Sequence, residues 1–150
     1  MKAIQIAVEL EKQVIEQLMR LGQAASLYWL SEKEEEIVKL LQTLADKDPA
    51  KCMYPEFSAE WAEHMPHDEW ESDSLRTTMD LLNLVWLLEK TVQFYQQAAK
   101  NSPYPSQQFF FSSLSKWKLL LRKRVEGVAK HAHSQLWQEL GFSPFAWEIG

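Results

Sequence analysis

The sequence predicts an all-α fold, a four-helix bundle with a long crossover between its second and third helices and a short C-terminal helix or tail. Four long segments carry apolar residues at steps of three and four, the period of an amphipathic helix. No segment shows a convincing period-two alternation, which a half-buried strand would require. A proline-containing connector separates the segments into two pairs, and two helical hairpins joined by a long crossover are a known bundle topology.

The first hairpin spans residues 2–48. Its first helix covers Lys2 to Leu21, and its apolar stripe comprises Ile4, Val8, Ile15 and Leu18. The second helix starts at Ser31, which forms a capping box with Glu34, and it ends or kinks at Asp48 because proline follows.

The crossover spans residues 49–73. It has prolines at 55 and 66, several aromatic residues, and neither Lys nor Arg from Cys52 onward. This composition predicts a connector that carries a short helix after Pro55.

The second hairpin spans residues 74–140. Asp73 or Ser74 caps the third helix, which stops before the proline-rich loop that starts at Asn101. The fourth helix opens at Ser106 and makes a last turn before Gly141. We expect it to break near Gly127 or His133, and we expect the tail, residues 141–150, to pack back through Phe145 and Trp147.

Length and composition limit the possible functions. The 150 residues suit one domain with a packed core, at 46% hydrophobic and 25% charged residues. A single cysteine, Cys52, and the lack of a secretory signal favour the cytoplasm. No apolar run is long enough to span a membrane, and a net charge of -5 disfavours nucleic acid as a partner.

The two hairpins share a short sequence frame. Residues 8–14 and 86–92 align through a Leu, a Glu-Lys pair and a Val, which suggests a duplicated hairpin. Together with the run Ala7-Val8-Glu9-Leu10-Glu11-Lys12 and the pair Glu89-Lys90, this frame resembles the rubrerythrin branch of the ferritin-like superfamily. The resemblance covers most of the chain outside the crossover.

The resemblance implies a bundle whose metal site has been lost. In that family the first and third helices each supply a glutamate, the second and fourth each supply Glu-x-x-His, and together they bind two metal ions. Here both histidines and one carboxylate are missing, and a proline interrupts the second-helix motif, so the di-iron chemistry is not carried over. The vestigial metal-site positions are Glu11, Asp48, Lys51, Glu89, Lys118 and Leu121.

The spacing of the first helix supports part of this assignment independently. Glu11 falls on the apolar seam between Val8 and Ile15, and Glu89 has a similar place between two valines. A carboxylate on a core seam needs a partner. The resemblance places Lys118, and less directly Lys51, where metal ligands would otherwise project, so we hypothesise that a lysine ammonium stands in for the metal cation. In the alternative, both glutamates lie at a stripe edge and reach water, and Lys118 is exposed.

Other polar clusters have a functional and a plain interpretation. The histidines His64 and His67, with Glu60 and Glu63 nearby, could bind zinc or iron, although Pro66 interrupts the helical geometry and such connectors are commonly solvated surface. The pair His131 and His133 is spaced by two, so its rings point apart on a helix. A basic run on the fourth helix could contact an anionic ligand or be a solvated face; it comprises Lys116, Lys118, Arg122, Lys123 and Arg124, with Trp117.

These observations favour a non-catalytic bundle that serves as a binding or interaction module, for a protein partner or a small ligand, and that forms a homodimer. Candidates for the dimer surface are Trp29, Trp61 and Trp70. The leading prediction includes no cofactor. The alternative is a metal-binding oxidoreductase or metal-handling protein that holds iron, manganese or zinc in a rearranged site.

Overall fold

Four long helices make up most of the structure, a computed structural model that describes residues 1–21, 27, 30–47, 54–64, 73–139 and 141. Within these ranges there is no β-strand, so the prediction of an all-α fold with four long helices is confirmed. The elements are α1 (Ala3–Leu21), α2 (Leu30–Lys47), the short 3-10 helix η1 (Ala59–Ala62), α3 (Asp73–Asn101) and α4 (Pro105–Glu139).

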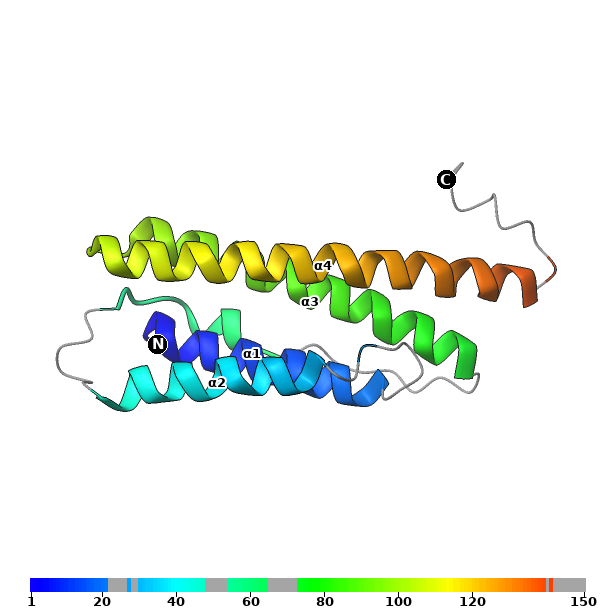
Figure 1. Ribbon diagram of the computed structural model, residues 1–150, viewed down its shortest axis with the longest axis horizontal. Helices are drawn as coiled ribbons and strands as arrows, with labels where there is room; N and C mark the ends of the chain where they lie inside the picture. Colours follow the sequence, from blue (N-terminus) through cyan, green and yellow to red (C-terminus); the bar gives the residue numbers. More distant parts are fainter. Residues whose placement is uncertain (22–26, 28–29, 48–53, 65–72, 140, 142–150) are drawn as a thin grey trace.

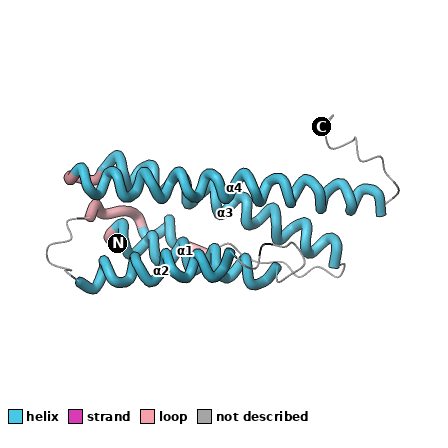
Figure 2. Tube along the Cα trace, in the orientation of Figure 1, coloured by secondary structure: helices cyan, strands magenta, loops and turns pink. Residues whose placement is uncertain are grey.

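The helices form two antiparallel pairs, as Figure 1 shows. Helix α2 packs on α1, α4 packs on α3, and the two pairs join through contacts between α1 and α3. The tube in Figure 2 shows that nearly all of the described chain is helical. The core lies between the pairs, and its largest fully buried apolar side chains include Leu10, Leu41, Leu84, Leu88, Phe94 and Phe111.

The predicted short helix after Pro55 is present as η1, which packs against α1. The hydroxyl of Ser58 caps it by accepting a hydrogen bond from the backbone N–H of Glu60, at 3.3 Å. Trp61 of η1 is half-buried, with its ring centroid 5.6 Å from that of Phe94. Trp61 therefore contributes to the protein's own core, and its place in a dimer surface stays a prediction; Trp29 and Trp70 lie outside the described residues.

Helix α4 is continuous, so the predicted break near Gly127 or His133 is wrong. A glycine inside a helix costs only about 1 kcal/mol relative to alanine, and the buried contacts of Val125 and Ala129 on either side of Gly127 favour continuing the helix. His133 is held within it, since its ring nitrogen Nε2 accepts a hydrogen bond from the Trp137 indole at 2.7 Å. The predicted tail contacts of residues 142–150 fall outside the described residues.

None of the helices in the described ranges is both long enough and apolar enough to cross a lipid bilayer.

Candidate functional site

The most unusual feature of the interior is a lysine with no exposed surface. Lys118 lies near the middle of α4, on the face that α4 turns toward the bundle centre, between the buried residues Leu114 and Leu121. Its ammonium nitrogen Nζ lies 2.5 Å from Oε2 of Glu11 and also forms a short ion pair with Oε2 of Glu34. Both glutamates are likewise buried completely. A lysine ammonium thus occupies the space between two carboxylates from α1 and α2.

Glu11 reaches this position because it shares the buried stripe of α1. Val8, Val14 and Leu18 on either side of it are buried, so the helix cannot turn Glu11 to water without exposing them. The hypothesis of an internal cation required Lys118 to meet Glu11, and in the structure the two side chains do meet.

Glu34 is the cluster's contribution from α2, and the sequence interpretation gave it a capping role instead. The structure buries it with Leu30, Val38 and Leu41, at helical steps of four, four and three. The same seam argument that singled out Glu11 would therefore have singled out Glu34. The predicted α2 positions, Asp48 and Lys51, lie outside the described residues.

The contribution from α3 is Tyr95, also missed in the sequence. Its hydroxyl donates a hydrogen bond of 2.6 Å to Oε1 of Glu11, and its ring is buried against Phe94 and Phe111, with centroids at 5.7 and 6.2 Å. Each of the four long helices thus places one polar side chain at the bundle centre.

Glu89 does not take part, and the expectation that it faces the bundle centre is wrong. It is exposed, and its Oε1 atom lies 3.9 Å from the guanidinium of Arg122. The core seam of α3 passes instead through Leu88, one residue earlier, and it includes Leu81, Leu84, Leu88, Thr91, Tyr95 and Ala98. One residue is a rotation of about 100° on a helix, which is enough to carry Glu89 out to the surface.

The remaining predicted positions divide between core and surface. Leu121 is an ordinary core residue. Glu60 and Glu63 are exposed, and the Nε2 atom of His64 lies 4.0 Å from Glu16 on α1, while His67 is outside the described residues. In the described ranges no three His, Cys, Asp or Glu side chains gather as a metal site.

Burial decides where the protons of the cluster lie. Desolvation raises the pKa of Glu11 to about 8, and the nearby charge of Lys118 only partly opposes this. Burial alone would also raise the pKa of Glu34. Its hydrogen bond with Glu11, the charge of Lys118 and the hydrogen bonds from Lys118 and Trp117 together outweigh the effect of burial, so the pKa of Glu34 is lowered. Burial and the charge of Glu11 raise the pKa of Tyr95 well above its usual range.

At neutral pH, therefore, Glu11 carries a proton, Glu34 is ionised and Lys118 balances its charge. A hydrogen bond between the carboxyl groups of Glu11 and Glu34 acts in the same direction, because it raises the pKa of Glu11 and lowers that of Glu34. The cluster as a whole is neutral, as a low-dielectric interior requires.

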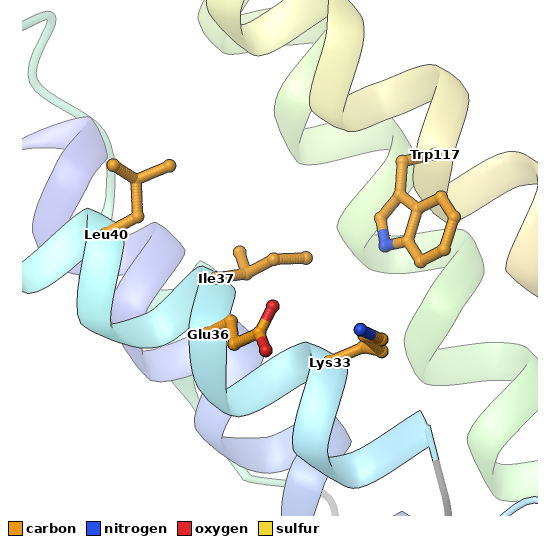
Figure 3. Close-up of a pocket in the computed structure, with 5 residues that line it drawn as sticks. All are labelled: Lys33, Glu36, Ile37, Leu40 and Trp117. Atoms are coloured by element: carbon orange, nitrogen blue, oxygen red, sulfur yellow. The ribbon is translucent and has the colours of Figure 1, made fainter.

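The side of the bundle between α2 and α4 is open. A pocket of about 320 Å³ lies there, lined by Lys33, Glu36, Ile37 and Leu40 of α2 and by Trp117 of α4 (Figure 3). The Trp117 indole N–H points to Oε1 of Glu34 at 3.4 Å, so its ring lies between the pocket and the buried cluster. The polar contacts of Glu34 with α4 thus join the two helices beneath this pocket.

Comparison with known proteins yields no relative: no protein family, curated protein or solved structure matches this chain significantly.

Proposed function

We propose that this protein is a non-catalytic bundle of the ferritin-like kind that has lost its di-metal site and acts as an interaction module, with a second copy of itself as a partner. The observation that carries this proposal is the buried Lys118 ammonium between Glu11 and Glu34. An ammonium supplies positive charge where a metal ion would supply it, and it leaves the carboxylates with no need of a metal.

The donor set supports the same conclusion. Iron, manganese and zinc sites of this type use several carboxylates with imidazole. Here the groups at the bundle centre are two carboxyls, one phenol and one ammonium, and the ammonium has no lone pair to offer while it is protonated. A metal would have to displace a fully buried lysine. The lone Cys52 favours a cytoplasmic location for the module.

Elemental analysis of protein purified without chelators tests the loss of the metal site. We expect iron, manganese and zinc far below one ion per chain, and a melting temperature that does not change when a chelator is added. Two bound ions per chain, or a fall in melting temperature on chelation, would overturn the proposal and support the metal-dependent alternative.

A further inference from the structure

The open α2–α4 side carries large apolar side chains that the protein's own core does not cover. Leu40 of α2 is 48% exposed, and Trp117 and Leu120 of α4 are 38% and 63% exposed. Leu120 follows Trp117 by one helical turn, and Phe109 shares the outer face of α4 with Leu120, three turns earlier. Leu40, Trp117 and the half-buried Ile37 line the pocket in Figure 3. Together with the exposed Leu120 and Phe109 of α4 they make up the apolar surface that we name the α2–α4 face.

Charged side chains of both signs border this face. Lys33 and Glu36 line the pocket from α2, and Lys116 is exposed on the neighbouring α4. The two helices run antiparallel (Figure 1), and the meeting of Glu34 with Lys118 sets their register. From this pair, two residues toward the C-terminus of α2 leads to Glu36, and two residues toward the N-terminus of α4 leads to Lys116. Because the helices are antiparallel, Glu36 and Lys116 therefore lie at the same level along the bundle.

This register fits a second copy of the chain related by a two-fold axis parallel to the helices. Such an axis sets α4 of the second copy over α2 of the first at the same level, and the reverse contact follows by symmetry. Glu36 then faces Lys116 of the second copy twice, and Trp117 of the second copy covers Ile37 and Leu40. A two-fold axis perpendicular to the helices would instead pack α4 of one copy on α4 of the other. With this axis at the level of Leu120, Lys116 of one copy would face Arg124 of the other, and the repulsion between these like charges disfavours that arrangement.

From these contacts we infer that the α2–α4 face is a homodimer interface, with α2 of one copy packed against α4 of the other. This inference rests on the proposed interaction role and identifies the surface through which two copies of the chain would associate. The lining chemistry is that of a protein interface, with an aromatic and aliphatic centre and charged residues at its border. The metal analysis described above does not depend on this surface, so the two proposals fail separately.

Sedimentation equilibrium over about 1–300 µM, a range that brackets micromolar dimers, tests the inference. We expect the wild-type protein to dimerise and Leu120→Glu to weaken the dimer by at least about tenfold, because it places charge in the apolar centre. Met19→Glu on α1 is the matched control, since Met19 is 51% exposed on a helix outside this face, and it leaves the dimer unchanged. Circular dichroism shows that each variant remains folded.

A charge-reversal pair tests the orientation. Glu36→Lys and Lys116→Glu each weaken the dimer by about tenfold, and the combined variant returns to within about threefold of the wild type, because the swap restores opposite charges. A protein that stays monomeric throughout would leave the face to a different partner and overturn the inference. A dimer unaffected by Leu120→Glu, or additive losses in the double reversal, would overturn it as well.

Discussion

The proton on Glu11 makes a quantitative prediction about stability and pH. Its pKa rises from 4.5 in the unfolded chain to about 8 in the folded protein, mainly because the side chain is buried. Between these values the unfolded chain releases the proton while the folded protein keeps it. The folded state is therefore favoured most below pH 4.5, and this stabilisation is lost as the pH rises toward 8.

Glu11→Gln removes this dependence while keeping the shape of the protonated side chain. A difference of 3.5 pKa units corresponds to at most about 5 kcal/mol, at roughly 1.4 kcal/mol per unit. The glutamine oxygen can still accept the hydrogen bond from Tyr95. We expect the variant to match the wild type within about 1 kcal/mol near pH 5 and to exceed it by several kcal/mol at pH 8.5.

Urea unfolding at constant ionic strength from pH 5 to 9 measures the difference between the two proteins. The exposed Glu89 provides the control, since Glu89→Gln makes the same chemical change at the surface. The lowered pKa of Glu34 makes stability depend on pH only below the pKa of this group in the unfolded chain, 4.5, so Glu34 does not affect the comparison between pH 5 and 9. A difference between Glu11→Gln and wild type that stays flat from pH 5 to 9 would show that Glu11 is ionised in the folded protein, contrary to our assignment.

Three further substitutions test the cluster and α4. Lys118→Met lowers the free energy of unfolding by about 3–5 kcal/mol, because it leaves the buried charge of Glu34 without a partner. Adding Glu34→Gln to this variant recovers at least half of the loss, and additive losses in chemical denaturation would contradict the ion pair. Tyr95→Phe removes the hydrogen bond to Glu11 and costs about 1–3 kcal/mol, and a loss below about 0.5 kcal/mol would argue against that bond. Gly127→Ala stabilises by about 0.5–1 kcal/mol, because nothing lies within 4 Å of the added Cβ and the backbone is helical; a lower melting temperature would count against a continuous α4.

Periodicity in the sequence located part of the buried cluster and missed the rest for physical reasons. Glu11 and Lys118 could be named in advance, Glu11 because α1 has one clear apolar stripe and Lys118 because of the family resemblance. In α3 the apolar residues surround most of the helix near Leu88, so the pattern does not fix the rotation of the helix and points to Glu89 rather than to Tyr95.

Glu34 shows a different difficulty, which is that one residue can satisfy two local interpretations. A Ser followed by a Glu three residues later is typical of a helix start, and Ser31 and Glu34 do lie in the first turns of α2. Capping, however, would leave Glu34 near the surface, whereas its spacing to Val38 and Leu41 places it inside. The spacing favours the buried position, and the ion pair with Lys118 on α4, far away in sequence, supplies the partner that a buried carboxylate needs.

The open side of the bundle also has a consequence for local unfolding. Helix α2 packs on α1, but its link to α4 runs through the polar contacts of Glu34 with Lys118 and Trp117. A helix attached along one face is expected to open as a unit before the rest of the fold. In native-state hydrogen exchange, the backbone amides of α2 should therefore exchange earlier than those of α3 and α4. Ionisation of Glu11 above pH 8 should make the α2 amides exchange faster still, because it weakens the cluster that holds α2 in place.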